Sequence, residues 1–374
     1  MNRRRFLQRT SILSGGLALA LPEITKEQDL ASRGWQTFEV TTHIEILKPA
    51  GVTRVWAPVS LLQETSFQRT ITNTLHCEAG TASIVKSARG LNLIAAEFPP
   101  GAKPTLTLTT QVETRNWVVD FSVPGNPRRA TQAELNEWLK PARMLPIDGI
   151  VKQRATEITQ AAKTEVDKAR AIYEWIVENT YRNPKTRGCG TGDIRFMLES
   201  GDLGGKCADL NALFVGLARA AGLPARDVYG IRIAPSRMGC SSLGVSSENV
   251  TKAQHCRAEV YLTAYGWVPV DPADVRKVIL EEPPGHLSLE DGAVKQVRAR
   301  LFGSWEMNWM AYNYAQDIAL PGAGGPPVHF LMYPQAETAD GRLDSLDPGN
   351  FRYQITSREH VAARANGRSN EGEA

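Results

Sequence analysis

The spacing of apolar residues changes near Thr131, and this change constrains the fold more than any other feature of the chain. From Trp35 onward apolar and polar residues alternate, as they do along 38–46, which is the pattern of a half-buried β-strand. After Thr131 the apolar residues recur every three or four positions, as they do along 164–179, which is the pattern of an amphipathic helix. Strand-like segments return after residue 224, so the chain is predicted to have an α+β fold.

The β-rich part predicts a sandwich. Its strand-like segments are separated by turn-forming stretches that contain Pro and Gly, as expected when short strands follow one another. We therefore predict a β-sandwich domain over 35–128, with strands near 38–46, 54–58, 91–98, 105–112 and 116–121.

The second part predicts helices packed with a sheet. Thr131-Gln-Ala-Glu134 is a capping box that begins the first helix. Gly222-Leu-Pro224 is a stop signal that ends the last one. We expect helices after Thr131, at 149–162, at 164–179 and from about 206 to 221, then strands at 225–233, 255–262 and 267–271. This gives a domain over 129–280, a C-terminal extension over 281–361 that packs on the core and holds a strand near 328–333, and a frayed tail over 362–374.

The first 21 residues have the composition of an export signal. The stretch Asn-Arg-Arg-Arg-Phe-Leu-Gln at 2–8 precedes a weakly apolar run at 10–21, which is too short to anchor stably in a bilayer. The segment resembles a twin-arginine signal, which carries folded proteins. The resemblance implies a periplasmic protein that begins with a linker over 22–34 and has no stable membrane span. A basic N-terminus on a cytosolic protein is the alternative.

The net charge of +3 comes from this leader. The chain has 43 basic and 40 acidic residues, and four arginines lie in the leader, so 39 basic residues remain against 40 acidic ones. With no basic stripe among the later residues, we expect no nucleic-acid partner.

The five cysteines exclude some kinds of site. No two of them form a Cys-x-x-Cys pair, so a zinc ribbon or a thioredoxin-like motif is not expected. An odd count in an exported protein leaves at least one free thiol or implies an intermolecular bridge. The sequence does not show how Cys77, Cys189, Cys240 and Cys256 pair, if they pair at all.

Cys207 stands out from the other cysteines because it opens an apolar helix directly after Gly204-Gly205-Lys206. The free N–H groups at a helix N-terminus favour an anion, and they lower the pKa of a thiol there. Cys207 is therefore the predicted nucleophile.

His255 and Asp271 are the predicted partners of this thiol. His255 begins one strand-like segment and Asp271 closes the next, with a tight connection at 263–266. A hairpin places the start of one strand beside the end of the next. A thiol, an imidazole and a carboxylate can form a triad for acyl transfer. The same three residues could also hold zinc, but the helix N-terminus favours a free thiolate, so we expect neither metal nor cofactor.

The residues around this triad resemble those of the transglutaminase-like superfamily. The similar stretches are Gly-Lys-Cys207-Ala-Asp with the helix that follows, His255 before Glu-Val-Tyr-Leu, and Gly-Trp-Val-Pro-Val-Asp271-Pro, within about 131–277. The β-rich segment before them is similar to the N-terminal sandwich of bacterial members. The resemblance implies a papain-like core in which helices pack on an antiparallel sheet, with Cys207 as nucleophile, His255 as base and Asp271 orienting the base.

One residue departs from the family pattern. Arg257 replaces the usual aromatic residue two positions after His255. It is predicted to bind an anionic substrate group or to pair with Glu259, and we favour the pair. The backbone N–H of Cys207 is the expected oxyanion donor, and Tyr181 is a candidate for the second donor.

The family does not fix the reaction. A thioester at Cys207 can pass to water, as in a peptidase or amidase, or to an amine, as in a protein transamidase. We favour hydrolysis of a peptide or amide bond in a peptide, a protein or cell-envelope material, with the loop at 234–254 and the sandwich shaping the cleft. A non-catalytic envelope binding module is the alternative of a different class.

Overall fold

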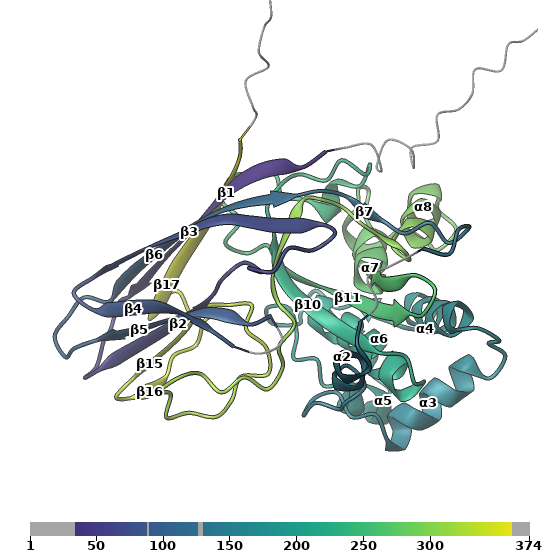
Figure 1. Ribbon diagram of the computed structural model, residues 1–374, viewed down its shortest axis with the longest axis horizontal. Coiled ribbons are helices and arrows are strands. Elements are labelled where there is room, and N and C mark those ends of the chain that lie inside the picture. The colour runs from purple at the N-terminus through teal and green to yellow at the C-terminus, as the bar shows by residue number, and fades with distance from the viewer. Residues whose placement is uncertain (1–33, 88–89, 126–129, 361–374) are drawn as a thin grey trace, which may run out of the picture.

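The computed structural model describes residues 34–87, 90–125 and 130–360. They form an elongated molecule with a β-rich part at one end and a mixed helical part at the other (Figure 1). The predicted signal over 1–21, all but the last residue of the linker and the tail over 362–374 lie outside the described residues. The predicted α+β class, with helices packed on an antiparallel sheet after a β-sandwich, is confirmed.

Two antiparallel sheets make up the β-rich part. Strand β6 alternates buried and half-buried residues along its whole length, as a strand with one face in a core must. The core between the sheets includes Ile44, Phe98 and Phe351. The first sheet has the order β17 (Phe351–His360), β1 (Gln36–Ile46), β6 (Thr105–Thr114) and β3 (Gln68–Glu78), and the second has the order β16 (Gly341–Arg342), β15 (Gln335–Thr338), β2 (Thr53–Pro58), β5 (Asn92–Phe98) and β4 (Thr81–Lys86).

The C-terminal extension supplies strands to this sandwich, which the predicted boundaries of 35–128 did not include. β15, β16 and β17 all come from the segment that we expected to pack on the helical core. β17 pairs with β1 along ten residues, so β1 is a central strand of its sheet and not an edge. Pairing between strands so far apart in the chain leaves no local pattern in the sequence.

Strands β3 and β4 were not predicted because their outer faces are largely exposed. The strand predicted at 116–121 is shorter than expected. Only β7 (Trp117–Val118) is extended there, and it pairs with β13 (Ser304–Trp305).

The helical part is built around one buried helix and one sheet. Helix α6 (Cys207–Ala220) is buried along its entire length, as expected of a helix that is apolar on most of its surface. It packs on the sheet and against α3 and α4. The sheet has the order β12 (Gly266–Val270), β11 (Gln254–Leu262), β10 (Ala225–Arg232) and β14 (Trp309–Asn313). The remaining elements are α2 (Gln132–Glu137), α3 (Gly149–Thr159), α4 (Glu165–Asn179), β8 (Tyr181–Arg182), α5 (Ile194–Ser200), β9 (Gly204–Gly205), η1 (Ser241–Leu243), α7 (Pro272–Glu281) and α8 (Gly292–Arg300).

One prediction after residue 260 was wrong, and another differs by one residue. The last strand of the hairpin, predicted at 267–271, is β12 and ends at Val270, while Asp271 caps α7, whose first residue is a proline. Proline fits the first position of a helix because its missing N–H would be unpaired there, so the Asp-Pro pair starts a helix. The segment 328–333 is not a strand, and only Val328 forms a bridge, with Ile318.

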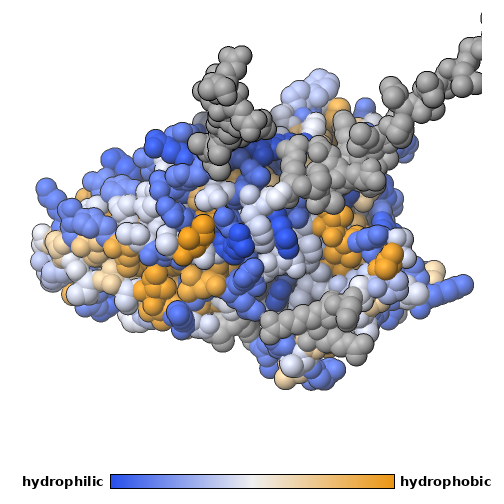
Figure 2. Space-filling model, turned by 45° about the horizontal axis from the view of Figure 1, so that its top comes forward, coloured by the Kyte–Doolittle hydropathy of each residue, from blue (hydrophilic) through white to orange (hydrophobic). Residues whose placement is uncertain are grey.

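The surface is mixed in character. On the face drawn in Figure 2 hydrophilic residues predominate and hydrophobic ones gather in separate areas. Within the described ranges, no helix combines the length and the apolar character needed to cross a bilayer.

Candidate active site

Cys207 lies in the first turn of α6 and is 4% exposed. The segment before it is held by Asp209, whose carboxylate accepts hydrogen bonds from the backbone N–H groups of Thr191, Gly192 and Lys206, each at 2.9 Å. Gly205 is needed here because a Cβ at this position would lie 2.5 Å from the Asp209 Cβ. The thiol is therefore placed on a rigid helix start.

His255 lies near the start of β11 and is 3% exposed. Its Nε2 is 2.7 Å from Oδ2 of Asp271 and 3.4 Å from Oδ2 of Asp274. The imidazole is also hydrogen-bonded to the sulfur of Cys207. Because Nε2 faces the carboxylates, Nδ1 is the ring nitrogen left for the thiol. The structure thus brings the three predicted residues together.

Asp271 is fully buried, and both of its carboxylate oxygens accept hydrogen bonds. Oδ1 accepts from the side-chain amide of Asn211 and from the backbone N–H of Asp274, both at 3.1 Å. Asn211 also donates to the carbonyl of Cys256 at 2.8 Å. Sequence reasoning missed Asn211, although it stands one helical turn after Cys207, which is a signal that it shares the face of the nucleophile.

A second carboxylate, missed in the sequence, lies beside the triad. Asp274 is buried and accepts two hydrogen bonds from Nη2 of Arg232, at 2.6 and 2.8 Å. Arg232 is buried too, and it donates to the carbonyl of Leu243 in η1. The pair therefore connects the triad to the loop that follows β10.

These charges favour the ionised form of the catalytic pair. Burial and Arg232 oppose protonation of His255, but the carboxylates of Asp274 and Asp271 outweigh them and raise its pKa to about 10. Hydrogen bonds from Cys189, Cys256 and His255 hold the pKa of the Cys207 thiol well below its usual range, although burial acts against them. Both shifts favour a thiolate–imidazolium pair over a neutral thiol and imidazole.

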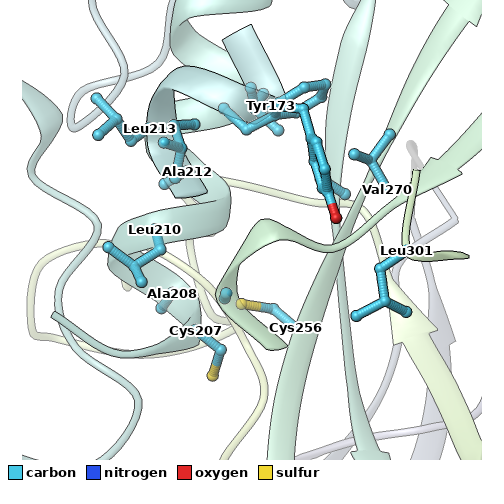
Figure 3. Close-up of a cluster of buried hydrophobic side chains, with 14 of the residues drawn as sticks. Tyr173, Cys207, Ala208, Leu210, Ala212, Leu213, Cys256, Val270 and Leu301 are labelled. Atoms are coloured by element: carbon cyan, nitrogen blue, oxygen red, sulfur yellow. The ribbon is translucent and has the colours of Figure 1, made fainter. Parts of the chain in front are cut away.

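Cys189 and Cys256 were not predicted to belong to the site. Figure 3 shows the side chain of Cys256 pointing from β11 toward the first turn of α6, where Cys207 lies. The hydrogen bond to Cys207 raises the pKa of Cys189, and burial raises that of Cys256. Both neighbours thus keep their protons. Cys256 can donate its proton to the thiolate in a hydrogen bond, and Cys189 can donate its single proton either to the thiolate or to the Gln254 carbonyl, 3.2 Å from the Cys189 sulfur. All five cysteines are free thiols, so the disulfide that the sequence left open is absent.

A cleft of about 570 Å³ opens onto the thiol and the imidazole. One wall is formed by residues 244–245 and 251–254 of the loop predicted to shape it, and another by Tyr333, Leu346 and Tyr353 from the C-terminal extension. Tyr353 belongs to β17 of the sandwich, so both parts of the molecule contribute to the cleft.

The prediction that Arg257 pairs with Glu259 is wrong. Glu259 pairs instead with Arg226 at 2.5 Å. Arg257 is buried, with Nε 3.8 Å from Oδ2 of Asp271 and its guanidinium 4.7 Å from the ring centre of Trp309. It does not line the cleft, so it is not placed to bind a substrate anion either. Arg257 and Glu259 are two residues apart on β11, but the partners that each of them finds come from elsewhere in the chain.

Tyr181 does not point at the thiol. It is 45% exposed, and its hydroxyl donates to Asp202 at 2.8 Å. A better-placed amide is that of Gln254, which lines the cleft and is 8% exposed. Among the described residues nothing accepts a hydrogen bond from its buried Nε2.

A metal site would have to use His255, Asp271 and Asp274, whose ligand atoms lie within 4.8 Å of one another. Arg232 already occupies both oxygens of Asp274, and Asn211 and the Asp274 N–H occupy Oδ1 of Asp271. These donors do not fit a cation, because its ligand oxygens must be free. The cluster is better described as an ion-pair network.

The fold and this cluster together are of the cysteine-enzyme type. Residues 152–272 match the model of the transglutaminase-like superfamily, within the range of about 131–277 that the sequence motifs indicated. This part of the chain is a transglutaminase-like domain.

Individual proteins are also similar to this chain. A protein of Haemophilus influenzae without an assigned function is 42% identical over 235 residues, which are 60% of this chain and 63% of the relative. The match thus spans less than two thirds of that relative. A candidate cysteine protease from Cytophaga hutchinsonii is 16% identical, with a TM-score of 0.49 over 87% of this chain and 99% of that one. The periplasmic domain of TgpA from Pseudomonas aeruginosa is 15% identical, with a TM-score of 0.34 over 72% and 94%.

We expect Cys207 to be alkylated at pH 6 about tenfold or more faster than an unfolded thiol, because its lowered pKa keeps it ionised. Iodoacetamide labelling followed by mass spectrometry of each cysteine peptide measures this rate. Cys77 is the internal control. Burial raises its pKa, so its rate should climb steeply with pH. Equal rates for Cys207 and an unfolded thiol at pH 6 would exclude an activated thiolate.

Proposed function

We propose that the protein is an exported cysteine enzyme that forms a thioester at Cys207 and hydrolyses a peptide or amide bond. The main observation behind the proposal is the position of His255, which is hydrogen-bonded both to the Cys207 sulfur and to Asp271. A structural histidine has no need of a thiolate with a lowered pKa on one side and a buried carboxylate on the other.

The first step forms the thioester. The Cys207 thiolate attacks the carbonyl carbon, and the C=O electron pair moves to the oxygen. When the tetrahedral intermediate collapses, the C–N bond breaks and the proton on Nδ1 of His255 passes to the leaving nitrogen. Asp271 holds the ring and keeps the proton on Nε2 throughout.

The second step releases the acyl group. Neutral His255 takes a proton from water as the water oxygen attacks the thioester, the C–S bond breaks, and the products are a carboxylic acid and the thiolate–imidazolium pair. A primary amine in place of water would give transamidation. Water needs no second binding site, which is why we favour hydrolysis.

Two donors are available for the oxygen of the intermediate. The backbone N–H of Cys207 is at the helix N-terminus, where such groups lack helical partners. We assign the second role to Gln254. It lies on the same face of β11 as Cys256, which contacts the nucleophile, and a buried amide without a partner is costly unless it serves a ligand.

Replacing Gln254 with Ala should lower kcat about 100-fold and change KM little, because one oxyanion donor is lost. A peptide aldehyde, which forms a tetrahedral adduct, should lose affinity in the same variant. Iodoacetamide labelling of Cys207 should keep its rate, since no oxyanion forms. The exposed Gln153 provides the control, Gln153→Ala. Unchanged kcat in Gln254→Ala would remove Gln254 from the oxyanion site.

The type of reaction is tested with peptide libraries, incubated with and without a labelled primary amine and analysed by mass spectrometry. Hydrolysis products that depend on Cys207, and are absent with Cys207→Ala, support the proposal. Amine incorporation that outpaces hydrolysis favours a transamidase. If no peptide is turned over and Cys207 is unreactive, the result favours the alternative that the protein is a non-catalytic binding module.

We also propose that the protein acts in the periplasm after twin-arginine export, with peptides, proteins or cell-envelope material as substrates. Replacing Arg3, Arg4 and Arg5 with Lys should leave it in the cytoplasm, because the paired arginines are the recognised feature of such signals. Cell fractionation and immunoblotting measure this. Unchanged periplasmic accumulation of the variant would mean that another route carries the protein.

A further inference from the structure

The cleft in front of Cys207 is lined by many more cations than anions. Among the residues that the structure describes, the one carboxylate that lines it is that of Glu281. The lining cations are Arg182, Arg187, Lys206, Arg232, Lys252 and Lys277. Since a hollow with low-dielectric walls concentrates the field of its charges, the balance between these groups decides what the cleft attracts.

Several of these cations are neutralised within the protein. Glu281 pairs with both Arg182 and Lys277, so one carboxylate serves two cations. Arg187 pairs with Asp344 at 2.5 Å, and Arg232 pairs with Asp274 as described above. Three carboxylates thus stand against six cations.

Two lysines carry part of this surplus of positive charge. No carboxylate of the described residues forms an ion pair with Lys206 or with Lys252. The reacting groups do not cancel this surplus, because the Cys207 thiolate and Asp271 are balanced by the imidazolium of His255 and the guanidinium of Arg257. Asp209, whose buried carboxylate accepts a hydrogen bond from the Lys206 N–H, offsets one of the three surplus charges and leaves two. The cleft therefore presents a net positive charge.

The two unpaired lysines flank the reacting residues. Lys206 immediately precedes the nucleophile, and Lys252 stands three residues before the base. Both line the same cleft as the thiol and the imidazole. An anion held by them would sit close to the carbonyl that Cys207 attacks.

Arg187 could add to such a site. Its side chain and that of Asp344 are 63% and 48% exposed, and an exposed pair of this kind is weak. A carboxylate entering the cleft can therefore compete for the guanidinium, which binds carboxylates with two parallel hydrogen bonds. Tyr333 and Tyr353 supply the apolar walls for the rest of a peptide.

From this charge balance, and resting on the function proposed above, we propose that the cleft selects substrates with a carboxylate next to the bond that is cleaved. The carboxylate is either an acidic side chain or a free C-terminus. Lys206 and Lys252 are the specificity-determining residues.

The first test uses peptide amides that differ only beside the scissile bond, with Glu, Gln or Lys, each with a free or an amidated C-terminus. We expect kcat/KM for the Glu peptide to exceed that for the Lys peptide about tenfold or more, mostly through KM, and the difference to shrink as salt rises. The free and amidated forms distinguish a C-terminal carboxylate from a side-chain one. Equal kcat/KM for all peptides would overturn the inference.

The second test needs no substrate. Iodoacetate carries a carboxylate and iodoacetamide does not, so the ratio of their rates at Cys207, divided by the ratio for the unfolded protein, measures anion selectivity. We expect this normalised ratio to be about ten for the wild type. The variant Lys252→Glu should lower the ratio to about one. Lys103→Glu makes the same charge change at an exposed position that does not line the cleft and should leave the value unchanged.

The two tests separate the failure of each proposal. A high ratio that depends on Lys252, together with no peptide turnover, would support the anion site and count against hydrolysis. Turnover without charge preference, together with a ratio that Lys252→Glu does not alter, would leave hydrolysis standing and overturn the anion site.

Discussion

Asp271→Asn should reduce turnover by up to about 10⁴-fold while leaving the protein folded, because the change reverses a hydrogen bond at the base. Nε2 of His255 now donates to Oδ2 of Asp271 at 2.7 Å. An asparagine amide at that position would donate instead, so the imidazole would have to carry its proton on Nδ1 when neutral. It could then no longer take a proton from water in the second step.

The alternative orientation of the asparagine is no better. With its oxygen toward His255, its amide group would face the side-chain amide of Asn211 and the N–H of Asp274, which are both donors. The loss of negative charge also lowers the pKa of His255, which weakens the thiolate. Asparagine is itself a good N-cap, so the start of α7 should survive.

The measurements are kcat on any cleaved peptide, the rate of Cys207 alkylation at pH 6 and the thermal midpoint. Asp291→Asn, at the exposed start of α8, is the matched control and should behave as wild type. Near-wild-type turnover of Asp271→Asn would remove this carboxylate from the catalytic group.

Arg232→Met should destabilise the fold by about 3–5 kcal/mol, the usual cost when one partner of a buried ion pair is removed. The carboxylate of Asp274 would remain buried without its two hydrogen bonds from Nη2, and the carbonyl of Leu243 would lose a donor. Urea unfolding at neutral pH measures the change. The exposed pair of Arg358 with Glu248, at 3.0 Å, gives the control Arg358→Met, which should cost about 0–1 kcal/mol.

The effect of Arg232→Met should depend on pH. Burial acts to raise the pKa of Asp274, but Arg232 and His255 hold it well below its usual range. The stability from this depressed pKa is present above the unfolded value, about 4, and is lost as the pH falls through the folded value. The gap between wild type and variant should therefore narrow in acid. An equal gap at all pH values, or equal costs for Arg232→Met and Arg358→Met, would contradict this account of the pair.

The sequence predicted the parts of the site that depend on local patterns of residues. The helix start at Cys207 and the strands that carry His255 and lead to Asp271 follow from periodicity and stop signals. Arg232 and Cys189 were missed because their partners, Asp274 and Cys207, lie far away in the chain. Their contacts exist only after α6 has packed on the sheet.

The same reasoning explains what was right and wrong in the fold. The alternation along β1 and β6 predicted strands, since one face of each is buried. It could not show that β17 is the second neighbour of β1. Helix α7 was missed because an Asp-Pro pair begins both turns and helices, and its apolar residues were too few to decide between them.

The pairing of β17 makes the two distant ends of the described chain depend on each other. β17 pairs with β1 and also forms backbone hydrogen bonds with the loop beside the cleft. The Val250 N–H donates to the Ile355 carbonyl at 2.8 Å, and the Ser357 N–H donates to the Glu248 carbonyl at 2.9 Å. The ribosome adds the nucleophile, the base and the carboxylate long before Tyr353 emerges. A chain cut short between Asp271 and Tyr353 would hold all three reacting groups beside a cleft that lacks a wall, so the site is complete only once β17, the last of the described strands, has been translated.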